Sequence, residues 1–334
     1  MRSMNQLGND LYSGKASFPF VGRRRLWFII AAVLVIGAAL VPLIRPMQFS
    51  IEFTGGSQFV VSGIGSDAEQ SQASDAVLSV VPDAATKVVV VGNSDGANSV
   101  RVQTDQMTPD QTSEVSAALA KAYDIPAAEV TSSFIGPSWG EEVTRQSLWG
   151  LAIFLALTFL ILALYFRTWK MSAAAIIGLV DVLVITVGVY ALFGFEISPA
   201  AVIGFLTILS YALYDTTVVF DKIRENTTED GEVSGRTFGD SVNLAVNQTL
   251  IRSINTTVVA VLPTGAILFI GAVWLGARTL TDISLSIFVG TIVAAYSTIF
   301  VAAPLYSLLR EREPAILSRD ARVIAARETA SAER

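Results

Sequence analysis

The chain has 334 residues, of which 52% are hydrophobic and only 16% are charged, with a mean hydropathy of +0.56 and a net charge of −6. Since a soluble domain is about 25% charged, this composition indicates an integral membrane protein. The sequence has no Cys and no His, which excludes disulfides and thiolate metal sites and removes the side chain that usually titrates near neutral pH. Any proton chemistry must therefore depend on carboxylates.

The N-terminal segment, residues 1–25, is polar and ends in three arginines. Residues 26–44 then form an apolar run of about 19 residues, longer than the core of a signal peptide, which has about 7–15. No small-residue cleavage site follows the run. We therefore expect a retained first transmembrane helix, and the arginines before it predict a cytoplasmic N-terminus.

Residues 45–147 change character, because they contain no apolar run long enough to span a bilayer. Four β-rich strings alternate with two windows of helical periodicity: Gln58–Ser62, Ser66–Val81, Lys87–Gly92, Val100–Thr104, Thr108–Tyr123 and Val130–Ile135. Thr108 and the pair Ser66-Asp67 are typical of helix starts. The order strand, helix, strand, strand, helix, strand predicts one α+β ferredoxin-like domain. Thirteen acidic and four basic residues make residues 46–146 strongly acidic.

Five further apolar runs predict transmembrane helices two to six within residues 148–308: 148–166, 172–193, 198–220, 250–274 and 281–308. The helices are joined by a polar loop at 221–249 and followed by a charged tail at 309–334. The pieces on the predicted cytoplasmic side hold sixteen Lys and Arg, against six on the opposite side. This asymmetry places both termini in the cytoplasm and residues 45–147 outside it.

Three ionisable residues lie inside the predicted spans. At 1.5 Å per residue, Asp181 is about 14 Å, Asp215 about 10 Å and Arg252 about 12 Å from the cytoplasmic face, so the three share one layer. Spacing adds two polar stripes, one of Thr207, Tyr211 and Asp215 and one of Gln248, Arg252, Asn255 and Thr256. Polar stripes in spans face other helices or water rather than lipid.

We interpret Asp215 as a carboxylate that takes up and releases a proton, with its distance from Arg252 coupling protonation to helix movement. The alternatives are a static ion pair for Asp215, a snorkelling side chain for Arg252 and an interhelical hydrogen bond for Asp181. The sequence contains no phosphate-binding loop, metal-spaced cluster or nucleophile elbow. We therefore expect a transport protein with no enzymatic activity, metal or cofactor, and with protons as the coupling ion.

Four motifs resemble those of a known family. LSYALYDTTVVFDKIREN (residues 209–226) resembles G-Y-S-L-N-D-T-V-V-V-F-D-R-I-R-E-N of the SecF family. Residues 52–56 (Glu52, Phe53, Thr54, Gly55 and Gly56) resemble its D-F-T-G-G, residues 135–142 its V-G-P-x-x-G-x-E, and residues 248–252 its Q-T-L-x-R. The matches occur in the family's order and run from the first span to the fifth.

The resemblance implies an RND-like bundle in the bacterial plasma (inner) membrane. Members of this family pair with SecD, associate with the SecYEG channel and indirectly with the SecA motor, and use the proton-motive force to help complete export of unfolded proteins. The resemblance also implies that the chain is surrounded by the lipid bilayer and has no nucleic-acid partner. The family's proton-transfer residues fall on Asp215, Arg252 and Asp181.

This sequence departs from the family pattern beside those residues. Val180 stands where the family usually has His, and Tyr214 where it has Asn. Ser210 and Ala212 replace Gly and Ser in the same motif, and Glu52 replaces Asp with the same charge. The departures leave Asp215 in place and change its neighbours, so we expect a phenol in place of an amide contact or a different proton path.

Two other functions remain open at this stage. One is an RND-type proton-coupled exporter of small molecules or lipids, which would carry two such halves in one chain. The other is a scaffold without a proton role, which would tolerate loss of the intramembrane carboxylate.

The charge asymmetry predicts the orientation of the chain. A reporter fused near Gly96 should be exported, and reporters fused near Gly231 or Ala325 should be cytoplasmic, because cytoplasmic loops retain Lys and Arg. The measurement is the activity of a compartment-dependent reporter, and a cytoplasmic signal from Gly96 would contradict the assignment of spans.

Overall fold

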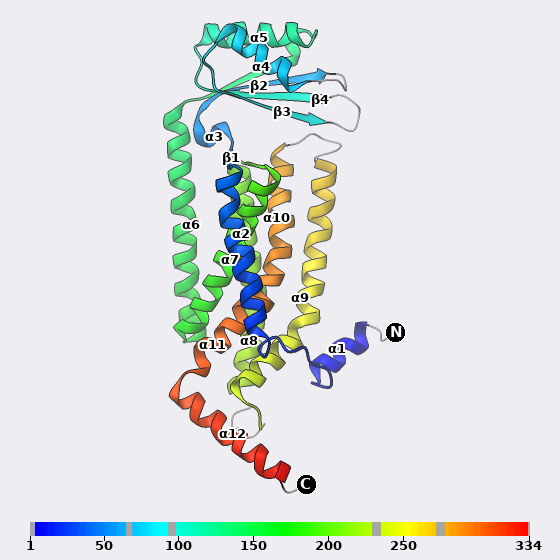
Figure 1. Ribbon diagram of the computed structural model, residues 1–334, viewed down its shortest axis with the longest axis vertical. Coiled ribbons are helices and arrows are strands. Elements are labelled where there is room, and N and C mark those ends of the chain that lie inside the picture. The colour runs from blue at the N-terminus through cyan, green and yellow to red at the C-terminus, as the bar shows by residue number, and fades with distance from the viewer. Residues whose placement is uncertain (1–3, 65–68, 93–97, 229–234, 272–277, 333–334) are drawn as a thin grey trace.

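Six helical segments are long and apolar enough to cross a membrane: α2 (Arg24–Ile44), α6 (Pro137–Phe166), α7 (Trp169–Phe193), α8 (Pro199–Thr228), α9 (Phe238–Phe269), and α10 (Arg278–Ser297) continued by η3 (Thr298–Ala302) and α11 (Ala303–Glu311). They belong to a computed structural model that describes residues 4–64, 69–92, 98–228, 235–271 and 278–332. Figure 1 shows the bundle with an α+β domain at one end and both termini at the other.

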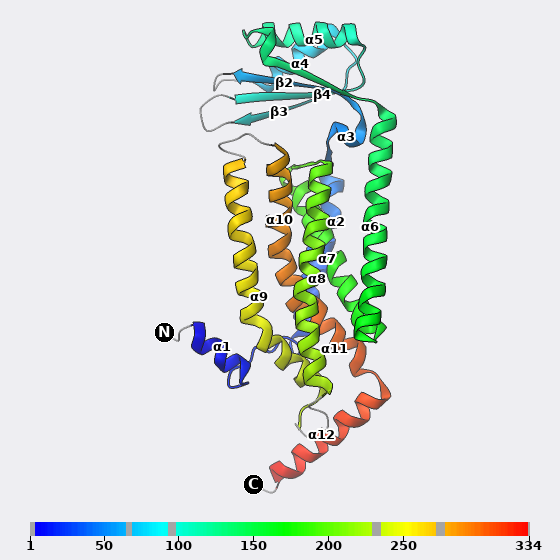
Figure 2. The same cartoon turned by 180° about the vertical axis from the view of Figure 1, so that it is seen from behind.

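The helices extend beyond the apolar runs. Helix α6 begins at Pro137, before the predicted start at 148, and α8 and α9 together occupy most of the predicted loop 221–249. Residues 229–234 of that loop, residues 272–274 of the fifth predicted span and residues 275–277 after it lie outside the described residues. The tail forms helix α12 (Pro314–Ala332), and helix α1 (Met4–Tyr12) precedes the first span. Figure 2 shows α8 beside α10, and α8 also packs against α9.

The α+β domain has one four-stranded antiparallel sheet. Its elements are β2 (Gly56–Ile64), α4 (Gln70–Val80), β3 (Thr86–Gly92), β4 (Asn98–Thr104), α5 (Pro109–Ala122), η1 (Ala127–Glu129) and β5 (Val130–Ile135). The strand order is β3-β4-β2-β5, so the two strands that are adjacent in sequence, β3 and β4, pair, and β2 lies between β4 and β5. Helices α4 and α5 cover one face of the sheet (Figure 1).

The two helices of the domain are amphipathic, as their periodicity predicts. Val77 of α4 and Val115 and Leu119 of α5 are fully buried and pack with the apolar side chains of β2 and β4, such as Phe59. Each such side chain contributes about 1.5–3 kcal/mol when it is fully buried.

The predicted start of α5 is confirmed, because the Thr108 side chain caps it by accepting a hydrogen bond from the Gln111 N–H at 3.3 Å. The start predicted at Ser66-Asp67 lies outside the described residues, and the described helix α4 begins at Gln70.

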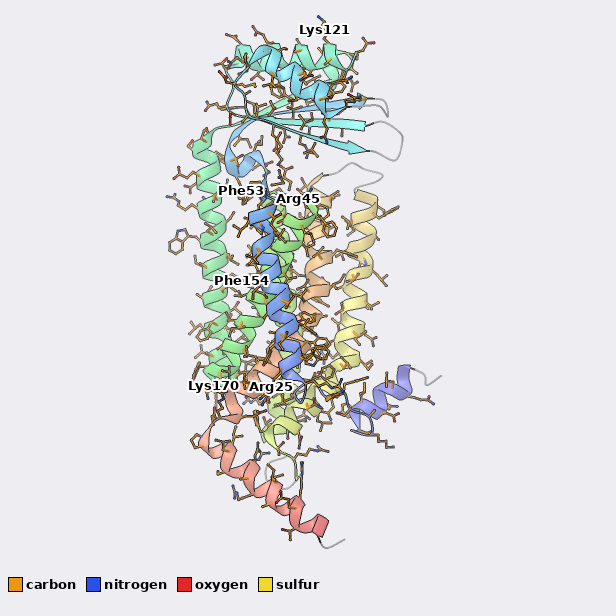
Figure 3. The ribbon with its side chains drawn as sticks, viewed as in Figure 1. Arg25, Arg45, Phe53, Lys121, Phe154 and Lys170 are labelled. Atoms are coloured by element: carbon orange, nitrogen blue, oxygen red, sulfur yellow. The ribbon has the colours of Figure 1, made fainter. Side chains whose placement is uncertain are left out.

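The domain is joined to the bundle where helix α3 (Ile51–Thr54) meets the start of α6. Gly55 has φ +73°, and a Cβ there would lie 2.9 Å from Pro137 Cα. A Cβ on Gly140 would lie 2.6 Å from the Phe53 carbonyl oxygen. Only glycine therefore permits the two backbones to approach so closely. Gly55 of one motif and Gly140 of the other thus allow α3 and the start of α6 to pack together, a contact that we call the interlock. Figure 3 shows Phe53 at this end of the bundle.

A second connection reaches the loop that precedes α8. Strand β1 (Gln48–Phe49) pairs in parallel with β6 (Glu196–Ile197). The Glu196 carboxylate accepts a hydrogen bond from Gln103 Nε2 at 2.7 Å and lies 3.4 Å from the Arg101 guanidinium, both from strand β4. The Arg101 and Glu196 side chains are only 17% and 13% exposed. The sheet of the α+β domain thus contacts strand β6, which lies directly before α8.

The interlock at Gly140 yields a paired prediction. Gly140→Ala should destabilise the chain by about 1–3 kcal/mol, because the new methyl group overlaps the Phe53 carbonyl. Gly150→Ala, in the same helix but with no atom within 4 Å of the added Cβ, should be neutral or stabilise by up to about 1 kcal/mol. Thermal unfolding of both variants in one detergent tests this, and equal effects would contradict the interlock.

Candidate functional site

Asp215 lies in α8 and is only 5% exposed. Its Oδ1 accepts a hydrogen bond of 2.8 Å from Ser253 Oγ of α9, and Ser253 is 1% exposed. Its Oδ2 is buried and has no hydrogen-bond partner among the described residues. A membrane-spanning helix therefore carries a carboxylate with one oxygen hydrogen-bonded to a neighbouring helix and the other buried with no described partner.

The static ion pair that was the alternative interpretation of Asp215 is not formed with Arg252 among the described residues. Arg252 Nη2 instead donates to the hydroxyl of Tyr214 at 3.4 Å, and both side chains are exposed in the isolated chain. Within the described part of the chain no ion pair joins Arg252 to Asp215. The Tyr214 phenol thus contacts the guanidinium rather than the carboxylate, while Ser253, which the sequence analysis missed, contacts the carboxylate.

Asp181 lies in α7 and is 6% exposed, and its Oδ2 is buried without a partner among the described residues. One turn earlier, the Gly178 carbonyl accepts a 3.0 Å hydrogen bond from Ser297, the residue before the π-helical turn η3. The first residue of that turn, Thr298, shares a 3.0 Å hydrogen bond with Thr216, the neighbour of Asp215 in α8. The sixth span therefore contacts both carboxylate-bearing helices, and π-helical turns are frequent at functional sites.

Two tyrosines add further buried polar atoms. The hydroxyls of Tyr211, one turn before Asp215, and Tyr296 have no hydrogen-bond partner within the described residues. An unpaired buried polar group costs about 1–3 kcal/mol, so each one requires an explanation such as water, an ion or a reaction. The orphaned atoms of Asp181, Asp215, Tyr211 and Tyr296 all belong to helices of the bundle.

The other predicted supporting residues divide into two groups. Thr207 and Thr256 donate to carbonyls of their own helices, at Ile203 and Arg252, both at 2.8 Å, and Asn255 is exposed. Gln248 lies apart from the carboxylates, because its side chain accepts from Asn226 Nδ2 at 2.9 Å and donates to the Tyr12 carbonyl at 3.1 Å. Gln248 therefore connects α8, α9 and the N-terminal segment.

The motif Glu52–Gly56 lies at the opposite end of the bundle from Gln248. At 1.5 Å per residue, Asp215 is about 24 Å along α8 from the helix start at Pro199, where the α+β domain makes contact. Phe53, Gly55 and Gly56 shape the junction, and Glu52 Oε2 is buried without a described partner. The structure thus places this motif at the junction rather than at the intramembrane carboxylates.

The side chains at this site can exchange both hydrogen bonds and protons. A carboxyl group can accept a hydrogen bond when it is charged and donate one when it is protonated, and a serine hydroxyl can serve in either direction. In the described residues no group of three or more acidic, His or Cys side chains could hold a metal ion.

Comparisons with known proteins agree on one family. Residues 115–312 match the family model described as "Protein export membrane protein SecD/SecF, C-terminal". The chain is 38% identical to the protein translocase subunit SecF of Streptomyces coelicolor, over 98% of this chain and 86% of the relative, and 39% identical to that of Mycobacterium leprae, over 94% and 69%.

A solved structure has the same fold. The crystal structure of SecDF, described as a translocon-associated membrane protein from Thermus thermophilus, superposes with a TM-score of 0.74 at 27% identity. The match covers 89% of this chain and 39% of that chain, so this chain corresponds to about two-fifths of the longer protein.

The Ser253 hydrogen bond can be measured by a double-mutant cycle. Asp215→Ala and Ser253→Ala should show a coupling energy of about 1 kcal/mol in unfolding, because each substitution removes one partner of the hydrogen bond and intramembrane hydrogen bonds have this magnitude. Thr264→Ala serves as the control, because Thr264 bonds only carbonyls of α9. Coupling of Asp215 to Thr264 as large as its coupling to Ser253 would contradict the assignment.

Proposed function

The chain belongs to the SecD/SecF family of protein export membrane proteins, and we propose that it is an accessory subunit of the Sec protein translocase that couples the proton-motive force to protein export. The observation that carries the proton role is Asp215, a carboxylate 5% exposed within a membrane-spanning helix, with one oxygen bonded to Ser253 and the other unpaired. Ionisable groups at this depth are costly and mark ion and proton pathways.

The coupling step is an exchange of partners on α9. Ser253 and Arg252 are adjacent in sequence, so their side chains point about 100° apart around the helix. In the described state Ser253 bonds Asp215 and Arg252 bonds Tyr214. A rotation of α9 that brings Arg252 to Asp215 favours the charged carboxylate, and its reversal favours the protonated one. Protons act as the coupling ion and no other cofactor is required.

A partner subunit covers the outer side of this pair. The exposed polar side chains on α8 and α9 at span depth are Thr207, Ser210, Tyr214, Arg252 and Asn255. Such a face is costly against lipid tails and is covered by protein or water. SecD is the proposed partner, because a relative of Thermus thermophilus named SecDF is a longer chain, of which this chain covers 39%.

The α+β domain is proposed to be ferredoxin-like and extracytoplasmic, with both termini cytoplasmic, in the bacterial inner membrane. Its β-α-β-β-α-β order and its sheet order β3-β4-β2-β5 support the fold, and the excess of basic residues on the other side supports the orientation. There the domain lies where emerging unfolded protein passes, beside the SecYEG channel that the SecA motor feeds.

The proton role is tested with two substitutions. Asp215→Asn removes the titratable proton with little change of shape, so the protein should insert normally but lose gradient-dependent translocation. Arg252→Met keeps the apolar stem and removes the charge that the carboxylate needs, and should also abolish it. The double variant should be no worse than either single one, because the residues act as a unit. The measurement is translocation into membrane vesicles with and without a proton gradient.

Asp221→Asn provides the matched control in the same helix. Asp221 lies near the end of α8, where it accepts from the Tyr165 hydroxyl at 3.2 Å, and its substitution should leave gradient dependence intact. Full gradient-dependent activity of Asp215→Asn would refute the proton role and favour a scaffold.

A further inference from the structure

A cavity of about 410 Å³ lies where the first span meets the corner between α11 and α12. Its lining consists of Arg24, Arg25, Phe28, Leu308, Glu311, Arg312 and Leu317. A volume of this size lies within the usual range of ligand sites, about 300–1,000 Å³. Figure 3 shows Arg25 at the end of the bundle away from the α+β domain.

Most charges around this corner are already paired. The Arg24 guanidinium lies 2.5 Å from Glu311, whose other carboxylate oxygen accepts from Ser307. Glu313 lies 3.0 Å from Lys170 and 3.2 Å from Arg310. Partial burial opposes the charged form of Glu313, but these two cations outweigh it and hold the pKa of Glu313 below its ordinary value.

Two arginines of the cavity remain without a counter-charge. Arg25 and Arg312 are exposed, and no ion pair or hydrogen bond joins either side chain to another described residue. Since Arg24 and Glu311 neutralise each other, the lining carries two unbalanced positive charges. A guanidinium binds phosphate oxygens in a bidentate manner.

The remaining lining is apolar and lies at the membrane boundary. Phe28 follows one turn after Arg24, where the first span begins, and Leu308 and the 56%-exposed Leu317 come from α11 and α12. Arginines at the start of a span lie at the level of the lipid headgroups, and their side chains extend toward them. The cavity thus combines positive charge at headgroup level with an apolar wall.

A neighbouring hollow on the other side of Arg24 shares Arg24, Arg25 and Glu311 with the first cavity. It adds Arg23 and Asp240, and the Asp240 carboxylate is paired with the Arg327 guanidinium at 2.8 Å. Charge therefore does not separate the two hollows. The first cavity differs in its wall, because only there do Phe28, Leu308 and Leu317 lie beside the arginines.

We propose that Arg25 and Arg312 bind the phosphate of an anionic phospholipid, with an acyl chain against Phe28, Leu308 and Leu317. The lipid fixes the first span to the corner of the last one. The site is separate from Asp215 and does not depend on the proton role.

Binding to the purified full-length chain tests the site. Short-chain phosphatidylglycerol is added in detergent, with short-chain phosphatidylcholine and inorganic phosphate as separate probes, and bound lipid is counted by native mass spectrometry. We expect phosphatidylglycerol to bind in preference to both. Arg25→Gln with Arg312→Gln should weaken its binding roughly 30-fold, because each interfacial arginine contributes about five-fold.

The control pair is Lys15→Gln with Lys121→Gln, which removes the same charge from exposed positions outside the cavity and should leave binding unchanged. The single variant Arg312→Gln, with an expected loss of about five-fold, keeps the test decisive if the double variant does not fold. Equal binding of the two lipids, equal loss in the control pair, or displacement by inorganic phosphate at the same concentration as the lipid would each overturn the proposal.

Discussion

The hydrocarbon layer of a membrane penalises every polar group that it leaves unpaired, and the bundle answers this constraint in two ways. Most hydroxyls in the spans bond a carbonyl one turn earlier in their own helix, as Thr186 does with Val182 at 2.7 Å and Thr264 with Ala260 at 2.8 Å. Asp215 cannot be satisfied within its helix, since a carboxylate needs a donor, and it takes one from Ser253 of another helix. The hydrogen bond between Asp215 and Ser253 therefore joins two spans, and it is the one that the proposed protonation of Asp215 changes.

Helix α8 links this contact to the α+β domain without a break. It runs through Asp215 from Pro199, two residues after the strand pair β1–β6. The carboxylate of Glu196 in that pair is held by Arg101 and Gln103 of the domain's sheet. At the same loop, Ser198 donates to Asp282 of α10 at 2.6 Å. The proposed movement of α8 at Asp215 would therefore reach the loop that makes a buried charged contact with the domain, because a helix is a rigid element.

The sequence predicted the features that depend on a single segment, such as the spans, and missed the contacts that depend on how two segments pack. Hydropathy located the spans, and burial of Asp215 followed from its place in an apolar helix. Periodicity shows which residues share a face of one helix, but it does not show how neighbouring helices are rotated. Arg252 and Ser253 are adjacent, so a difference of about 100° decides which of them meets Asp215. The partners of Glu196 were missed for the same reason, since they come from a strand far away in the chain.

Two neighbouring contacts between α8 and α9 now define the site. The inner one joins Asp215 to Ser253 and the outer one joins Tyr214 to Arg252. If Arg252 takes the place of Ser253 as the hydrogen-bond partner of the Asp215 carboxylate, a neutral donor is exchanged for a cationic one. The two hydrogen bonds differ by an energy on the order of 1–2 kcal/mol. A proton that crosses 100 mV releases about 2.3 kcal/mol. The energy of one proton is thus of the same order as the difference between the described arrangement and the proposed one, so the proposed coupling is energetically possible.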